Sequence, residues 1–413
     1  MKLSQCILLL LFLLLLSNCT ESPTQVKDDN SNDIVKKYSS KIKIVSSIDI
    51  GGKDTRFDFK ISPKNPEDLS LIEGREIRWD FDSDGIYETD WAVSDSISKV
   101  FSKIDKHQIT ANVKLAEDTI LVSSTIVYTQ PVENLLSDTT YFVHEMCYSY
   151  DEKNIYFAWG SYPHQIYKID KNGGPIEGVT TNLASDDCRH FPVASPNGKY
   201  LAYSYNGGLD LFNLESKTEN QIASVYTFCT NTFTSDSKYF LTNDGSCNEI
   251  HLINVLTGTD SLLLTNAHEA AVVPQKNEIA YLRYTESPDT ISEVDLVFYD
   301  LKTKQNVKVY NNIPFPYRSP FQIIEGSKAI YFTEAHILYY LESGNSYKID
   351  TDESKKYFSW PSTISQNGNN VLFSTGKGMI RVTLPSDLEW IYKYSCITHI
   401  AKRSQLCVGF SNF

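Results

Sequence analysis

A short motif that recurs along the last two thirds of this 413-residue chain limits its fold more than any other feature. The motif is a polar turn followed by about three apolar residues, which is typical of a turn that leads into a buried strand. It returns at intervals of roughly 35–51 residues, the period expected of propeller blades. The apolar stretches begin at or near Ile155, Leu201, Phe240, Ile279, Ile330, Val371 and Leu406.

Each of the first six motifs is followed by a second apolar stretch, a turn and a further short strand. Four antiparallel strands make one blade, and blades that close into a ring leave only short, protected edges. We therefore predict an all-β chain in which residues 132–413 form a β-propeller. The second strands are expected at Gln165–Asp170, Leu209–Leu214, Glu249–Asn254, Val294–Leu301, His336–Leu341 and Met379–Leu384.

One repeat carries a longer sequence signature before its apolar strand, Pro192-Val193-Ala194-Ser195-Pro196-Asn197-Gly198-Lys199. This stretch resembles the Pro-x-x-Ser-Pro-Asp-Gly-Lys signature of TolB-like, WD-type β-propellers, with Asn197 in place of the aspartate. The resemblance implies the propeller fold. It implies no particular activity, because propellers host many functions.

The number of blades depends on how the ring closes. Only two strands of a seventh repeat are expected at the end of the chain, at Cys396–Ile400 and Leu406–Phe410. Glu133–Asp138 precedes the first repeat much as Glu219–Ser224 precedes the third, so it can supply a missing strand. We predict a six- or seven-bladed propeller whose final blade is shared by both ends, and we favour seven blades.

Residues 41–131 alternate apolar and polar side chains in several short runs, as strands with one buried face do. With turns such as Asp84-Gly85 between them, these runs predict a small Ig-like β-sandwich. The stretch Trp79-Asp80-Phe81-Asp82-Ser83-Asp84-Gly85 resembles the core motif of PKD (polycystic kidney disease) domains. The resemblance implies a spacer or adhesion module.

The same region holds a group of acidic residues, Asp80, Asp82, Asp84, Glu88 and Asp90. Calcium binds six to eight oxygens, and Asp-x-Asp-x-Asp-Gly opens an EF-hand loop. The twelfth position of such a loop is Trp91 rather than glutamate, so this is not an EF-hand. We expect a solvated acidic turn, with a weak calcium site as the alternative, and no other cofactor.

The N-terminus has the features of a targeting sequence. Lys2 precedes the apolar run Ile7–Leu16, whose length of about ten residues suits a signal peptide and is too short to span a bilayer. Leu16-Ser17-Asn18-Cys19 resembles a bacterial lipobox, which implies a signal peptide at 1–18 and lipidation of Cys19; an ordinary cleaved signal is the alternative. Residues 19–40 are too polar to fold and are expected to form a flexible tether.

Four residues fall at equivalent places near the start of the predicted innermost strands: His144, His190, Cys229 and His268. Histidine and cysteine are ligands for Zn²⁺ and similar metals. Equivalent positions on a ring are spread around the channel, whereas a metal needs its ligands about 2.0–2.3 Å from one point. We therefore expect side chains that cap strands, with a metal site at the channel mouth as the alternative.

The predicted propeller contains six cysteines, and the oxidising compartment of a secreted protein permits disulfides between them. The pairs that we predict are Cys396 with Cys407 and Cys229 with Cys247, which leaves Cys147 with Cys188. Free buried thiols are the alternative.

The formal net charge of −13 leaves no basic footprint for a nucleic acid, so no nucleic-acid partner is expected. The sequence contains no nucleophile elbow, P-loop or His-Glu-x-x-His motif. We predict a non-enzymatic protein of the bacterial envelope, lipid-anchored at the outer membrane or cell surface, whose propeller binds a protein or glycan partner. The alternative is a metal-assisted polysaccharide lyase or hydrolase that uses the propeller channel.

Overall fold

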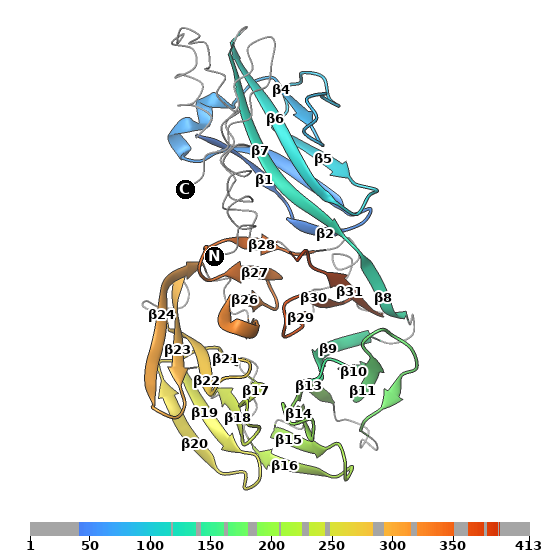
Figure 1. The fold of residues 1–413 in the computed structure, drawn as a ribbon, viewed down its shortest axis with the longest axis vertical. Coiled ribbons are helices and arrows are strands. Elements are labelled where there is room, and N and C mark those ends of the chain that lie inside the picture. The colour runs from blue at the N-terminus through green and yellow to red at the C-terminus, as the bar shows by residue number, and fades with distance from the viewer. Residues whose placement is uncertain are drawn as a thin grey trace, which may run out of the picture.

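A computed structural model describes residues 41–388, apart from 117–118, 138–141, 161–163, 181–187, 206–207, 225–230, 244–247, 284–292, 315–319, 351–361, 376–377 and 387. The regular structure of these residues is almost entirely β-strand, and the strands form two groups of sheets (Figure 1). In the described part of the chain, no helix has the length and apolar character needed to cross a membrane.

The first group consists of two sheets that enclose one core. The strand order is β1-β3-β5 in one sheet and β2-β7-β6-β4 in the other. Both sheets contribute to the core, which includes Phe57, Phe59 and Trp79. The strands are β1 (Ile42–Ser46), β2 (Ile50–Gly52), β3 (Arg56–Pro63), β4 (Ile77–Asp80), β5 (Ser96–Val100), β6 (Lys106–Ala116) and β7 (Thr119–Gln130), and a 3-10 helix η1 spans Pro66–Leu71.

The second group contains six four-stranded antiparallel sheets in the described residues from 132 to 383, which lie around a common centre like propeller blades (Figure 1). The first strand of each sheet is innermost. These strands are β9 (Phe142–Tyr148), β13 (Arg189–Ala194), β17 (Asn231–Phe233), β21 (Ala270–Val272), β25 (Phe321–Ile323) and β29 (Thr363–Ile364).

The outer strands of the six sheets follow the predicted order of strand, turn and strand. They are β10 (Asn154–Gly160), β11 (Gln165–Asp170), β12 (Glu177–Gly178), β14 (Tyr200–Tyr205), β15 (Gly208–Asn213), β16 (Glu219–Ala223), β18 (Tyr239–Asn243), β19 (Glu249–Asn254), β20 (Asp260–Thr265), β22 (Glu278–Arg283), β23 (Glu293–Asp300), β24 (Gln305–Pro314), β26 (Ala329–Phe332), β27 (Ile337–Tyr340), β28 (Ser346–Lys348), β30 (Asn370–Ser374) and β31 (Gly378–Thr383), with a 3-10 turn η3 at Glu325–Ser327.

The sixth sheet is completed by a strand from the other end of the ring. β8 (Val132–Ser137) pairs antiparallel with β31, which gives the order β29-β30-β31-β8. The sequence analysis identified the closing strand but expected it to complete a blade with the strands at 396–410. In the structure it pairs with β31. The strands expected at 396–410 lie outside the described residues, so the count of six sheets applies to the described part only.

The two groups of sheets pack against each other beside this closure. β7 leads through Pro131 into β8, and Ile50 forms a parallel bridge with Ile349. The backbone N–H of Asp350 donates a hydrogen bond to the carbonyl of Ile50 at 3.0 Å. Ile50 and Tyr128 share one apolar cluster with residues of the fifth and sixth propeller sheets.

Closure of the ring can be tested at Leu135, which is 6% exposed and packs with Leu372 and Met379. Leu135→Ala leaves a cavity between the two ends of the ring, so we expect the free energy of unfolding to fall by about 2–4 kcal/mol in urea denaturation. The control is Ala at the exposed neighbour Asn134, which should change it by less than about 0.5 kcal/mol. A loss below 1 kcal/mol for Leu135→Ala would show that β8 is not a structural part of the sixth sheet.

Candidate metal centre

The innermost strands of the first two propeller sheets are irregular at equivalent places. On β9 the pairing with β10 shifts so that His144 and Glu145 lie opposite the single residue Ala158. On β13 the same shift leaves Phe191 and Pro192 opposite one residue of β14. Bulges of this kind re-aim side chains and are common next to active sites. Both bulges lie on the side of the ring where histidines gather.

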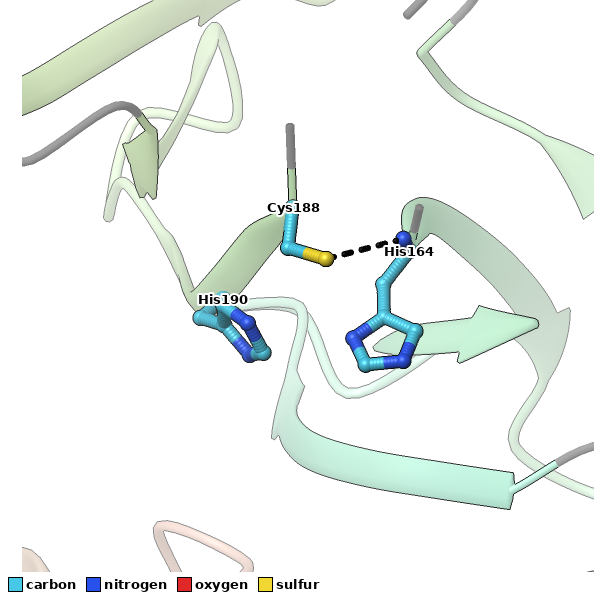
Figure 2. A group of neighbouring side chains, drawn as sticks. All are labelled: His164, Cys188 and His190. Atoms are coloured by element: carbon cyan, nitrogen blue, oxygen red, sulfur yellow. Dashed lines mark hydrogen bonds between the residues drawn. The ribbon is translucent and has the colours of Figure 1, made fainter. Parts of the chain in front are cut away.

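Three side chains converge beside these bulges (Figure 2). His164 lies directly before β11, Cys188 directly before β13, and His190 is on β13. One ligand atom from each lies within 4.8 Å of the others. The backbone N–H of His164 also donates a hydrogen bond to Sγ of Cys188 at 3.4 Å. We call His164, Cys188 and His190 the His/Cys cluster.

A third histidine stands next to the His/Cys cluster. The ring centre of His144 is 3.8 Å from that of His164 and 6.1 Å from that of His190. Of the four residues singled out by repeat spacing, His190 is in the His/Cys cluster and His144 lies beside it, so the expected spread around the ring and the alternative of a metal site both stay predictions. His268 belongs to no such cluster in the described residues, and Cys229 lies outside them.

Sequence reasoning missed His164 and Cys188. Neither occupies a repeat-equivalent position, because each precedes its strand in a connection of its own. The nearest available signal was that Cys188 stands two residues before His190, so that both point to the same side of an extended chain.

Glu145 connects the His/Cys cluster to the centre of the ring. The residue is 6% exposed, and Oε2 of its carboxylate lies 3.2 Å from Nδ1 of His190. Burial alone would raise the pKa of Glu145, but the hydrogen bond and charge of His190 lower it instead. A proton on Nδ1 donated to this carboxylate leaves Nε2 of His190 for another ligand, an arrangement that metal-binding histidines commonly use.

The environment favours neutral imidazoles. Burial, followed by the neighbouring His144 and His190, lowers the pKa of His164 to about 4. Burial also lowers the pKa of His144. Neutral imidazole is the form that binds metals, so these rings need not lose a proton at neutral pH.

The strand segment that carries Cys188 and His190 is anchored by the residue between them. The Arg189 side chain is 2% exposed and turns into the second sheet, where Nη2 lies 2.8 Å from Oε2 of Glu219. Nε and Nη2 of Arg189 also reach Oε1 of Glu219, at 3.2 and 3.1 Å. The Tyr203 hydroxyl donates to that same Oε1 at 2.5 Å. A paired, fork-like contact of this kind fixes the strand's orientation.

A cavity of about 330 Å³ lies at the centre of the ring, lined mainly by the six innermost strands. Its size is at the lower end of the range for small-molecule sites. Glu145 and Phe191 line it, so it adjoins the His/Cys cluster on one side. Glu334 lines it too, and burial raises the pKa of that carboxyl group.

The His/Cys cluster suits a tetrahedral metal ion. Zn–N and Zn–S bonds of about 2.0–2.3 Å place ligand atoms about 3.3–3.8 Å apart. Since the ligand atoms all lie within 4.8 Å of one another, inward movements of at most about 1 Å would bring them to these separations. Three protein ligands leave one position open, as catalytic rather than structural zinc sites do.

A second group, Asp80, Asp82 and Glu88, also has carboxylate oxygens within 4.8 Å of one another; Asp84 and Asp90 are not part of it. These carboxylates accept turn hydrogen bonds: Oδ2 of Asp80 from Gly85 N–H at 3.0 Å and Oε2 of Glu88 from Phe81 N–H at 2.8 Å. Burial raises the pKa of Asp80. The acidic turn is thus stabilised within itself, and calcium binding stays a prediction.

The described cysteines are not oxidised. Cys147 and Cys188 are free thiols, so the pair left over in the sequence analysis is not formed. Burial raises the pKa of Cys147 to about 12, which makes this thiol inert. The lipidation residue Cys19 and the predicted pairs Cys229–Cys247 and Cys396–Cys407 lie outside the described residues.

Comparison with known proteins yields structural likenesses, three of which follow. No family model matches the chain, and no curated protein does. An auxiliary nutrient binding protein from Bacteroides thetaiotaomicron shares 11% identity, with 83% of this chain and 97% of the other covered at a TM-score of 0.42. An oligogalacturonate lyase from Vibrio parahaemolyticus shares 11% identity, covering 69% and 99% at a TM-score of 0.40. An oligogalacturonate lyase in complex with manganese shares 15% identity over the same shares at 0.41.

These comparisons correct one prediction. Two of the similar structures are enzymes, which contradicts the prediction that this protein is not one. The prediction leaned on the absence of familiar catalytic motifs, and a site assembled from separate strands and connections leaves no such motif.

Asp210 on β15 is buried close enough to Arg189 and Glu219 to feel the charges of both. Its protonation therefore provides a test of the electrostatics around this ion pair. Its side chain is 4% exposed, and Oδ2 has no hydrogen-bond partner among the described residues. Burial, reinforced by Glu219 and opposed by Arg189, raises the pKa of Asp210 from 3.8 to about 6. The folded protein thus binds a proton that the unfolded chain releases. This contribution to stability is complete below pH 4 and is lost as the pH rises to about 6.

Asp210→Asn removes that loss. We expect the variant to melt at a higher temperature than the parent at pH 7.5 and at nearly the same temperature at pH 4, measured by circular dichroism. Glu215→Gln, an exposed change in the turn that follows β15, should leave the melting temperature unchanged at both pH values. An Asp210→Asn variant that melts lower at pH 7.5 would mean that the ionised carboxylate stabilises the sheet.

Proposed function

We propose that this protein is a metal-assisted polysaccharide lyase or hydrolase, whose metal ion is held by the His/Cys cluster and whose substrate enters the central cavity. The observation that carries the proposal is the convergence of His164, Cys188 and His190 next to a cavity, with Glu145 in contact with both. His164 comes from the connection before β11, whereas Cys188 and His190 come from one segment at the start of β13, which the pair of Arg189 with Glu219 holds.

The residues of the site have two separate roles, metal binding and proton exchange. His164, Cys188 and His190 hold the ion, and thiolate with imidazole favours Zn²⁺ or a similar metal over Ca²⁺ or Mg²⁺. Such an ion polarises a substrate oxygen or lowers the pKa of bound water. Glu145 orients His190 and, because it also lines the cavity, is placed to exchange a proton with a bound sugar.

The proposal extends to the location of the protein. The apolar run and lipobox-like Leu16-Ser17-Asn18-Cys19 support an anchor at Cys19, with the PKD-like residues 41–131 as a spacer below a propeller at 132–413. Mass spectrometry of the membrane fraction is expected to find an acylated N-terminal Cys19. A mature chain that begins at another residue would contradict the anchor and leave the metal site unaffected.

The metal site is tested by substitution of its sulfur ligand. We expect the full chain to retain close to one Zn²⁺ per molecule after gel filtration, measured by elemental analysis. Cys188→Ser should weaken the binding by tenfold or more, because a thiolate ligand is lost. Glu145→Gln should weaken it about 10–100-fold, the usual cost of losing the partner that orients a metal-binding histidine.

Cys147→Ala is the matched control, because Cys147 is the other described free thiol and lies outside the His/Cys cluster. It should bind metal as the parent does. A parent without metal, or a Cys188→Ser variant that binds as tightly, contradicts the metal site. Bound metal with no release of saccharide ends from any polysaccharide contradicts the catalytic part alone.

A further inference from the structure

The charges around the central cavity restrict the kind of saccharide that it accepts. Among the described lining residues the only ionisable carboxyl groups are those of Glu145 and Glu334, and none is a lysine or arginine. Recognition of a sugar carboxylate normally uses the fork of an arginine or a lysine ammonium group. The arginine closest in sequence to the His/Cys cluster, Arg189, is already paired with Glu219.

A bound divalent ion does not make the net charge around the cavity positive. An ion of charge +2 with the Cys188 thiolate and the Glu145 carboxylate sums to zero, and Glu334 adds no positive charge. Glu334 is moreover in a setting where burial disfavours a negative charge. A carboxylate brought in by a uronic acid would meet the same penalty, and the described lining residues include no lysine or arginine to offset it.

The other lining residues are those that bind neutral, hydroxyl-rich rings. Amide and hydroxyl groups come from Asn231, Thr232, Gln322 and Thr363, beside several aromatic side chains. Small-molecule sites combine apolar and aromatic walls with a few polar groups that fix orientation.

One aromatic residue that lines the cavity has an unfavourable backbone conformation. Phe191 has φ = +52°, in the left-handed region that bulky residues rarely adopt. It occupies the β13 bulge, is half-buried, lines the cavity and has its ring centre 6.1 Å from that of His190. Strained residues of this kind persist where surrounding structure enforces them, often at ligand sites.

We infer that the central cavity binds an uncharged saccharide, and that Phe191 is the platform on which one sugar ring packs beside the His/Cys cluster. The inference rests on the hydrolase form of the proposed function, because β-elimination by a lyase needs the carboxylate of a uronic acid. It adds the substrate class and a specificity-determining residue. The aromatic face covers the apolar face of the ring, while the lining amides and hydroxyls accept and donate hydrogen bonds at its edge.

The test is calorimetric titration of the full chain, loaded with one equivalent of Zn²⁺, with two sets of hexasaccharides at low salt. One set contains the neutral polymers of glucose, mannose, galactose and xylose, and the other the corresponding uronic acid polymers of glucose, mannose and galactose. We expect at least one neutral hexasaccharide to bind, and every acidic one to bind tenfold or more weakly. Tighter binding of an acidic hexasaccharide, or binding of none, overturns the inference.

Two variants separate a binding role of Phe191 from a structural one. Phe191→Gly relieves the positive φ and removes the ring, so we expect an unchanged or higher melting temperature together with a tenfold or greater loss of saccharide affinity. Tyr239→Ala, which removes an exposed aromatic outside the cavity lining, should retain the parental affinity. A Phe191→Gly variant that melts lower but binds as the parent does shows a structural residue.

Failure of this inference can be told apart from failure of the proposed function. If the chain binds Zn²⁺ through Cys188 and cleaves an acidic polymer, the function stands and the inference falls. If the chain binds a neutral saccharide in a Phe191-dependent way but holds no metal, the inference about the cavity stands and the metal-assisted function falls.

Discussion

The pairing of β8 with β31 is the interaction on which the rest of the structure depends. It ties the start of the propeller to the end of its last described sheet, so that β9 follows directly on the closing strand. Only in a closed ring does every innermost strand face a shared cavity. Burial of Leu135 between Met379 and the first sheet supplies the apolar contact that holds the junction.

The candidate centre uses two departures from regular β-structure. The bulges on β9 and β13 contain His144, Glu145 and Phe191. Glu145 contacts His190 and lines the cavity together with Phe191, and His144 packs on His164. The buried pair of Arg189 with Glu219 holds the segment between two of the ligands. A rigid scaffold of this kind can bring together residues that belong to no recognisable sequence motif.

Much of the fold could be predicted from the sequence, because a turn followed by an apolar triplet reports a local structure. The closing strand at 133–137 was recognised from its likeness to another repeat. The site was only half predictable. His144 and His190 share a repeat position, whereas His164 and Cys188 reach the cluster through connections whose course no periodicity fixes. The bulges on β9 and β13 depend on pairing between strands, which the spacing of residues along one strand does not show.

The central claim is that sulfur and imidazole from the His/Cys cluster bind one metal ion. X-ray absorption at the zinc edge of the full chain, loaded with one equivalent of Zn²⁺, tests it most directly. We expect one sulfur at about 2.3 Å and two or three nitrogens at about 2.0–2.1 Å, with the sulfur lost in Cys188→Ser. A shell of oxygens alone, or a sulfur signal that survives in Cys188→Ser, would contradict the account.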